Sequence, residues 1–182
     1  RSAFHEAKNE SVSGNLIIEQ FMDGPELSLD ALIFDNHIEI TGIADRIIER
    51  SPYFVEVGHT IPSILPECQQ EQVAEVFKAA IRAIGINIGA AKGDIKYTSK
   101  GPMIVELAAR LSGGWMSAHT FPVSTGINLY KAAIEIALGR PPSDLKPKRS
   151  WVSVERALIP PPGKILSIKG VATPPRVSIP SV

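Results

Sequence analysis

Two carboxylates at matching positions of a hairpin are the residues best suited to chemistry in this sequence. Residues 88–97 and 103–108 read as consecutive strands, and the residues between them are rich in turn formers. A hairpin symmetric about Lys100 places Asp94 directly opposite Glu106, with Cβ atoms about 5 Å apart. Two like charges held this way destabilise a sheet unless a cation lies between them. Mg²⁺ fits, because it takes one or two carboxylates and completes its shell with waters and phosphates.

Further polar residues surround this pair in the sequence. Arg110 follows Glu106 by four residues, and the flexible turn Ser112-Gly113-Gly114 comes next. Lys92, on the same strand face as Asp94, either balances the carboxylates, touches phosphate or is solvated. Together these residue types fit a site that transfers a phosphoryl group. The alternative is an exposed hairpin in which both carboxylates are solvated.

Composition excludes several classes of protein. The 182 residues include 19 basic and 19 acidic side chains, and the formal net charge of zero gives no argument for a nucleic-acid or membrane partner. No apolar run reaches the length of a membrane span, and the N-terminus lacks the apolar segment of a signal peptide. The single cysteine, Cys68, excludes an internal disulfide framework, and we expect a cytoplasmic protein. Because the chain begins with Arg1, we expect a fragment or a processed piece.

Apolar periodicity predicts both strands and helices. The best-marked helix covers 67–84 and a second covers 128–138, each ended by a glycine. Short turns between the first strands indicate an antiparallel meander. The helix at 67–84 is expected to bury Val73, Val76, Phe77, Ala80, Ile81 and Ile84. Extended segments are predicted at 15–22, 26–34, 38–45, 53–57, 151–158 and 164–169, with a loop at 59–63 and an irregular tail from 171.

Several motifs in order resemble the C-terminal half of an ATP-grasp domain. Residues 19–28, EQFMDGPELS, are similar to the family's adenine-binding strand and turn. The carboxylate hairpin is the second match. The third is 106–114, ELAARLSGG, which is similar to the Glu-x-Ala-Ala-Arg motif of the L-amino-acid ligase branch. Segment 59–66 also resembles that branch, and 160–165 resembles an element of the biotin-carboxylase-like proteins.

The resemblance implies an α/β fold, a mostly antiparallel sheet flanked by helices that forms the larger lobe of an ATP-grasp domain. It implies an ATP-binding segment in which backbone groups and apolar side chains meet adenine, and a glutamate, Glu26, that holds the ribose hydroxyls. Alternatively, Glu19 and Glu26 are ordinary acidic residues on the surface of a strand. The expected ATP-binding residues are Glu19, Gln20, Phe21, Met22, Glu26 and Lys92.

The resemblance also assigns the metal and the phosphoryl group. Asp94 and Glu106 match the carboxylates that bridge Mg²⁺ (or Mn²⁺) to the nucleotide phosphates. Arg110 matches the catalytic arginine that steadies the transferring group, and a structural ion pair to Glu106 is its alternative. Ala108 stands where many members have a metal-binding asparagine, which leaves a second metal open.

Substrate-side candidates come from several stretches. Ser112, Gly113 and Gly114 precede Trp115. In the ligase branch an aromatic residue that shapes the acceptor pocket occurs here, with the register offset by one, and a core tryptophan is the alternative for Trp115. His119 is more typical of a polar contact than of a base. The remaining candidates are Asp45, Arg46 and Arg156.

These matches predict a C-terminal fragment of an ATP-dependent ligase. Residues 1–14 would end a preceding small lobe, 15–145 would form the larger lobe, and 146–182 a terminal β element and tail. The reaction would join a carboxylate to an amine through an acyl phosphate, with an N-terminal lobe supplied in cis and a homodimer left open. The alternatives are a carbamoyl-phosphate-synthetase-like or biotin-carboxylase-like enzyme that uses bicarbonate, and a non-catalytic nucleotide-binding module. We expect the fragment alone to be inactive.

Overall fold

The computed structural model describes residues 2–170, so the tail predicted from 171 lies outside the described residues. The elements of this part, in chain order, are α1 (Ser2–Glu10), β1 (Glu26–Phe34), β2 (His37–Glu49), β3 (Val55–Ile61), α2 (Glu67–Ala83), β4 (Gly89–Thr98), β5 (Gly101–Ala108), the short π-helix η1 (Met116–Thr120), α3 (Phe121–Thr125), α4 (Leu129–Ala137) and β6 (Ser153–Arg156). No helix within 2–170 is long and apolar enough to cross a membrane.

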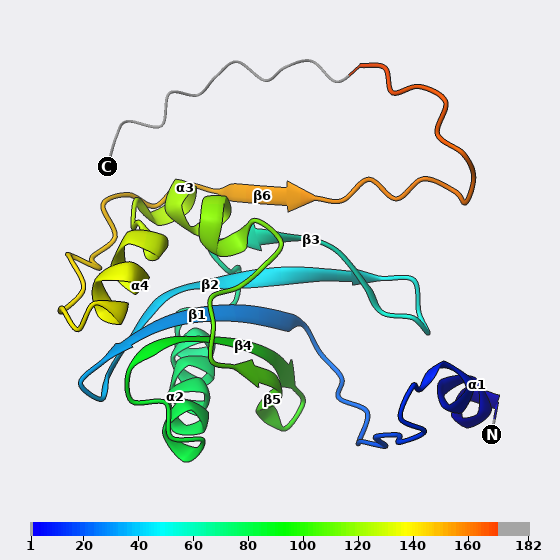
Figure 1. The fold of residues 1–182 in the computed structure, drawn as a ribbon, viewed down its shortest axis with the longest axis horizontal. Coiled ribbons are helices and arrows are strands. Elements are labelled where there is room, and N and C mark those ends of the chain that lie inside the picture. The colour runs from blue at the N-terminus through cyan, green and yellow to red at the C-terminus, as the bar shows by residue number, and fades with distance from the viewer. Residues whose placement is uncertain (1, 171–182) are drawn as a thin grey trace.

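The six strands form one sheet in the order β5-β4-β1-β2-β3-β6, and every neighbouring pair is antiparallel. Helices flank the sheet on both sides, with α2 on one face and η1, α3 and α4 on the other (Figure 1). The predicted antiparallel sheet with flanking helices is therefore confirmed. An antiparallel meander is present, but it consists of β1, β2 and β3, and the predicted first strand at 15–22 is not part of it.

The face under α2 is a closed apolar core. Val73, Phe77 and Ile81 are its fully buried helix residues, each four positions from the next, which places them on one face of the helix. Phe77 lies against Gly93 of β4, where an added Cβ would come within 2.5 Å of the ring. Ile84 is exposed rather than buried, because the helix ends one residue earlier. The core residues of the strands are Leu27, Leu29, Ala31, Ile33, Ile38, Ala91 and Ile95.

The opposite face holds a second apolar cluster and the polar residues of β1. Phe121 of α3 packs on Gly42 of β2, where an added Cβ would clash with the ring. Because side chains alternate along a strand, Ser28 and Asp30 lie on this face, while Leu27 and Leu29 pack under α2. Both faces of β1 are buried, which makes it the centre of the molecule.

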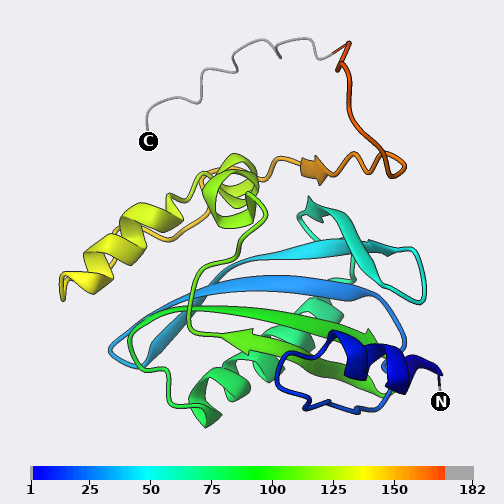
Figure 2. The same ribbon diagram turned by 45° about the vertical axis from the view of Figure 1, so that its right-hand side comes forward.

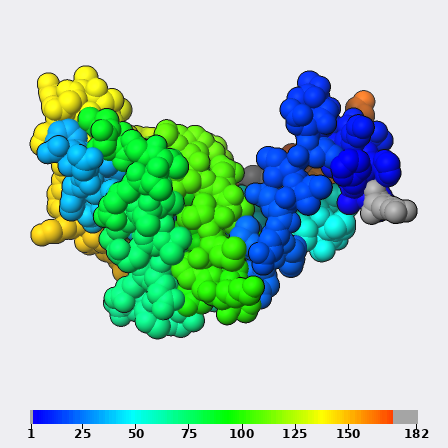
Figure 3. Space-filling view, turned by 90° about the horizontal axis from the view of Figure 1, so that it is seen from below, coloured from blue at the N-terminus to red at the C-terminus, as the bar shows by residue number. Residues whose placement is uncertain are grey.

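Three segments differ from the sequence prediction. Residues 15–22 and 164–169 form no strand, and β3 runs through His59 to Ile61 where a loop was predicted. The helix α1 has no buried residue. Figure 2 shows α1 in front of the sheet in that view, whereas Figure 1 shows it beyond the end of the strands and Figure 3 shows the N-terminal residues, in blue, projecting from the body of the molecule.

Candidate active site

Asp94 and Glu106 are direct partners in the β4–β5 ladder. The hairpin is not symmetric about Lys100, because Thr98 pairs with Gly101 across a two-residue turn. A register shift after Asp94 then leaves Val105 as the extra residue of a β-bulge. The predicted pairing is thus correct, and the bulge offsets the shorter turn.

Lys92 lies between these two carboxylates. Its ammonium group donates to Asp94 Oδ2 and, at 3.2 Å, to Glu106 Oε1. Lys92 is buried, so the solvated alternative for this residue is wrong. Ser28, opposite Asp94 on β1, donates its hydroxyl to Asp94 Oδ1 at 2.9 Å. Hard carboxylate oxygens already arranged around a positive charge have the donor chemistry that Mg²⁺ prefers.

Arg46 of β2 joins three carboxylates around the same region. Its Nη1 lies 2.6 Å from Glu26 Oε1 and 2.7 Å from Asp94 Oδ2, and its Nη2 lies 2.6 Å from Glu56 Oε2. Burial opposes the charge on Arg46, but the hydrogen bond to Glu56 and the charges of Asp94 and Glu26 outweigh it and raise its pKa. Glu56 was not among the predicted residues, and its one sequence signal is its place between two valines in an extended stretch.

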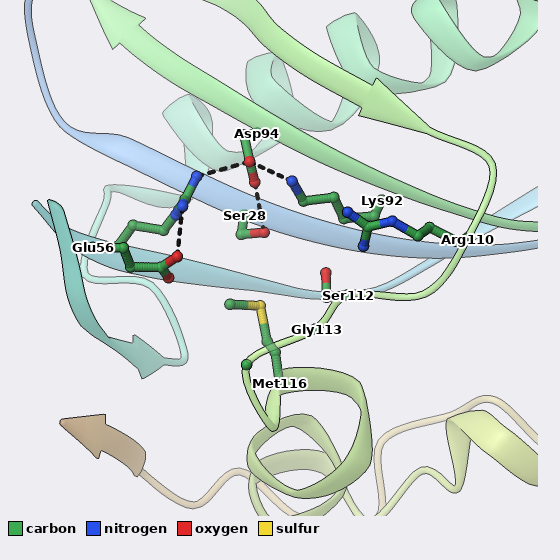
Figure 4. A pocket seen from close by; sticks show the side chains of 10 residues that line it. Ser28, Glu56, Lys92, Asp94, Arg110, Ser112, Gly113 and Met116 are labelled. Atoms are coloured by element: carbon green, nitrogen blue, oxygen red, sulfur yellow. Dashed lines mark hydrogen bonds and ion pairs between the residues drawn. The ribbon is translucent and has the colours of Figure 1, made fainter. Parts of the chain in front are cut away.

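A cavity of about 330 Å³ opens above these side chains. Figure 4 shows Ser28, Lys92 and Asp94 on the strands, facing Ser112 and Met116 on the segment that follows β5. The remaining lining residues are Arg46, Glu56, Arg110, Gly113 and Gly114.

Arg110 lies at the edge of this cavity. Its Nη2 is 3.8 Å from Glu106 Oε1 and its Nη1 donates to Leu111 O at 3.0 Å. More than half of the Arg110 and Glu106 side chains is exposed, so this ion pair is weak and the guanidinium is free to turn.

A buried acid absent from the sequence prediction supports the covering segment. Asp30 is fully buried, and its Oδ1 accepts from Ser112 N at 3.1 Å and Ser112 Oγ at 2.7 Å. Its Oδ2 accepts from Ser117 Oγ. Burial raises the pKa of Asp30, and the bonds from the two serines act in the opposite direction.

A second hollow of about 350 Å³ collects the predicted nucleotide segment. Phe21 and Phe54 lie across it with ring centroids 6.0 Å apart. Lys96 Nζ lies 3.6 Å from Glu26 Oε2, and Glu26 also contacts Arg46, which lines the first cavity. The hollow is lined by Glu19, Gln20, Phe21, Met22, Glu26, Phe54 and Lys96.

Three predicted substrate residues lie elsewhere. Asp45 accepts from Ser63 Oγ at 2.5 Å and from the Ile64 amide at 2.8 Å, and so holds the chain after β3. Arg156 donates to the His59 carbonyl at 3.0 Å and lines a different hollow. Trp115 is 65% exposed, so the core alternative for it is wrong.

The ring of Trp115 lies beside that of His119, with centroids 4.7 Å apart and ring planes inclined by 46°. Within residues 2–170, no group of three or more histidine, cysteine, aspartate and glutamate side chains could hold a metal ion.

Comparison with known proteins identifies the family. The family model described as "ATP-grasp domain" matches residues 1–119, so the chain belongs to the ATP-grasp domain family. Among curated proteins it is 29% identical over 131 residues to carnosine synthase 1 of Gallus gallus, covering 70% of this chain and 14% of that protein.

Solved structures agree with this assignment. The crystal structure of L-amino acid ligase from Bacillus licheniformis superposes with a TM-score of 0.70 at 26% identity, covering 79% of this chain and 37% of that one. The biotin carboxylase domain of Hydrogenobacter thermophilus 2-oxoglutarate carboxylase, solved with MgADP, ADP and bicarbonate, gives 0.69 at 21% identity, covers 85% of this chain and 35% of that one, and shares the fold. The chain therefore spans well under half the length of these relatives.

Proposed function

We propose that the protein containing this chain is an ATP-dependent ligase that joins a carboxylate to an amine. The observation that carries the proposal is the Asp94–Lys92–Glu106 arrangement beside a cavity that Arg110 also lines. In the first step a carboxylate oxygen attacks the γ-phosphorus of ATP, forming an acyl phosphate and releasing ADP. In the second step the amine attacks the acyl carbon, phosphate leaves and the amide forms. Phosphate leaves far more readily than hydroxide, which is the chemical reason for using ATP.

Asp94 and Glu106 are the residues that would hold Mg²⁺ or Mn²⁺. Such an ion, when bound, neutralises charge on the phosphoryl oxygens. These two side chains suit a divalent ion, because both offer carboxylate oxygens and already hold a positive charge, the Lys92 ammonium group, between them. Ala108 offers no side-chain donor, so we propose a single site completed by phosphate and water.

The second hollow is suited to the nucleoside. Phe21 is 73% exposed there and offers an apolar surface to adenine, together with backbone groups of Glu19, Gln20 and Met22. The carboxylate of Glu26 is suited to accept the two ribose hydroxyls. Because Glu26 contacts Arg46, which contacts Asp94, the ribose and the phosphates would lie on one continuous path. Lys92 would contact a phosphate from the inner end of that path.

Arg110 is suited to stabilise the transferring phosphoryl group. Its guanidinium can turn from Glu106 towards the cavity, and an arginine placed on developing phosphoryl charge contributes roughly 10³ in rate. Ser112, Gly113 and Gly114 line the side of the cavity where the carboxylate substrate would enter, with Arg46 as the inner cation. We assign Asp45 and Arg156 no contact with substrate, because their side chains bond to Ser63, Ile64 and His59 instead.

A screen of phosphate release tests the proposal. The protein that carries this chain is incubated with ATP, Mg²⁺ and pairs of amino acids, or with bicarbonate, and products are identified by mass spectrometry. We expect release that depends on an amino acid and a new amide. Release with bicarbonate alone would instead support the carbamoyl-phosphate or biotin-carboxylase type, and no release with any substrate would support a binding module.

Substitution of Glu106 sharpens this test. Glu106→Gln should lower phosphate release by at least about 100-fold, because one of the two metal carboxylates becomes a neutral amide. Glu75→Gln, which changes an exposed acid of α2, is the matched control and should leave release unchanged. The 182-residue chain alone is expected to show no turnover, and robust amide formation by it would contradict this expectation.

A further inference from the structure

Asp30 is a buried carboxylate next to the metal pair but separate from it. It lies directly opposite Lys92 across the β1–β4 ladder. The Lys92 ammonium nevertheless contacts Asp94 and Glu106, and the Asp30 carboxylate accepts instead from Ser112 and Ser117. Its direct partners thus all belong to the chain after β5.

That chain must cross the sheet to reach Asp30. It leaves the edge strand β5 at Ala108 and meets β1 at Ser112, two strand spacings of about 4.8 Å away. Arg110 lies midway along this crossing, and Gly113 and Gly114 follow the contact with Asp30. The glycines have no side chains to pack, and an added Cβ at either would meet nothing within 4 Å. Leu111 and Met116 pack on the second apolar cluster, so between these two anchors the bonds from Ser112 to Asp30 hold a stretch whose glycines contribute no packing.

A carboxylate is a costly way to fill this position. Burial disfavours its charged form, and a well-packed apolar side chain of similar volume commonly serves stability as well or better. Three donors converge on its two oxygens, and two of them come from Ser112 alone. This arrangement fixes the backbone of the crossing segment in a way that an apolar side chain cannot.

We propose that Asp30 is a positioning residue, which holds the crossing segment 109–116 so that Arg110 and the Gly113–Gly114 turn keep their places around the phosphoryl group. The inference rests on the proposed function and deepens it. Asp30 touches neither the nucleotide hollow nor the metal pair, so its loss should lower kcat and leave the KM for ATP nearly unchanged.

Two substitutions separate position from charge. In Asp30→Asn, Oδ1 can still accept from the Ser112 amide and hydroxyl, while Nδ2 can donate to the Ser117 hydroxyl. In Asp30→Ala all three bonds are lost. Asn128→Ala removes the cap of α4, where Asn128 Oδ1 accepts from Lys131 N at 2.9 Å, and is the control for lost stability away from the site.

The experiment measures kcat, KM for ATP and amide hydrogen exchange of residues 109–117 in the protein that carries this chain. For Asp30→Ala we expect kcat to fall about 100-fold, KM to change less than about threefold and exchange to quicken at least about tenfold. For Asp30→Asn we expect kcat within about fivefold of the wild type and a protected segment. Asn128→Ala should leave kcat and the exchange of 109–117 unchanged.

Opposite results overturn the inference. If Asp30→Asn lost as much kcat as Asp30→Ala while the segment stayed protected, Asp30 would act by its charge. If Asp30→Ala kept kcat or normal exchange, the positioning role would be wrong. Should Asp30→Ala fail to fold, the Ser112→Ala, Ser117→Ala double variant removes both hydroxyl donors and is held to the same expectation. If the wild type shows no turnover, the proposed function fails, and the exchange data alone still decide whether Asp30 holds the segment.

Discussion

Asp94 and Glu106 face each other across the β4–β5 hairpin and share the ammonium group of Lys92. Asp94 Oδ2 also lies 2.7 Å from Arg46 Nη1, so two cations converge on one buried carboxylate. A site that already concentrates negative oxygen atoms around positive charge can exchange part of that charge for a divalent ion. In the function we propose, Lys92 would compete with the metal in the free protein and would lie next to the phosphates in the complex.

Removal of Lys92 should strengthen metal binding. In Lys92→Met the metal no longer competes with the ammonium group, so we expect Mn²⁺ to bind the nucleotide-free protein about tenfold more tightly. Without metal the same variant should be less stable, because the carboxylates lose a counter-charge. Titration of Mn²⁺ followed by electron paramagnetic resonance checks the first effect and urea unfolding the second. Lys78→Met on α2 is the control, and unchanged or weaker Mn²⁺ binding in Lys92→Met would contradict the competition.

Arg46 should be important for stability. It is largely buried and contacts Glu26, Asp94 and Glu56 at 2.6 to 2.7 Å. Removing one partner of such a cluster leaves uncompensated charge, so Arg46→Gln should lower the free energy of unfolding by about 3 kcal/mol. Urea unfolding measures this loss. Arg82→Gln, on the exposed side of α2, should change it by less than about 0.5 kcal/mol, and a similarly small loss at Arg46 would show that the cluster contributes little.

The carboxylate hairpin and the main helix were within reach of sequence reasoning. Local chemistry determines both, since turn formers mark the hairpin and apolar spacing marks α2 from Glu67. The β-bulge at Val105 was not foreseen, although the Asp94–Glu106 pairing was. Residues 15–22 are apolar and β-prone but form no strand, because no neighbouring strand pairs with them and β-propensity describes fit to a half-buried surface.

The rest of the site depends on contacts between distant parts of the chain. Asp30 meets Ser112 and Ser117, which lie 82 and 87 residues away in the sequence. Glu56 of β3 is linked to Asp94 of β4 through Arg46 of β2, and β1 lies between β2 and β4. No local pattern marks an acid as buried when its partners come from the other half of the chain.

His59 should make stability depend on pH. It is buried, with Nε2 2.7 Å from Thr120 Oγ1, and this burial lowers its pKa from 6.5 although Glu155 acts the other way. As the pH falls below 6.5 the unfolded chain gains a proton that the folded chain does not. The free energy of unfolding should therefore decrease from pH 6.5 down to the lowered pKa of the folded state.

Urea unfolding at a series of pH values measures this dependence. His59→Gln should remove the part of the pH dependence of unfolding free energy that comes from His59. His37→Gln, at an exposed site, should leave this dependence unchanged. A wild-type profile that stays flat below pH 6.5 after the acidic groups are accounted for would contradict the assignment.

Gly93 should be required for the packing of β4 on α2. An added Cβ would lie 2.5 Å from the Phe77 ring, so Gly93→Ala should cost about 1–3 kcal/mol through overpacking. Phe77→Leu makes room, and the double variant should recover part of the loss relative to the sum of the single variants. Thermal unfolding provides the comparison, with Gly163→Ala, which meets nothing within 4 Å, as the control. If the losses of the two single variants simply added in the double variant, the Gly93–Phe77 contact would not be the source of the destabilisation.

The central claim is that Asp94 and Glu106 together hold one divalent ion against the nucleotide phosphates. The most direct measurement is the binding of Mn²⁺ in the presence of ADP to the wild type, to Asp94→Asn and to Glu106→Gln, with Glu39→Gln on the exposed part of β2 as the control. We expect one Mn²⁺ per chain in the wild type and the control, and affinity at least about 30-fold weaker in either site variant. Wild-type affinity in Glu106→Gln would show that the two carboxylates do not share a metal and would contradict the account.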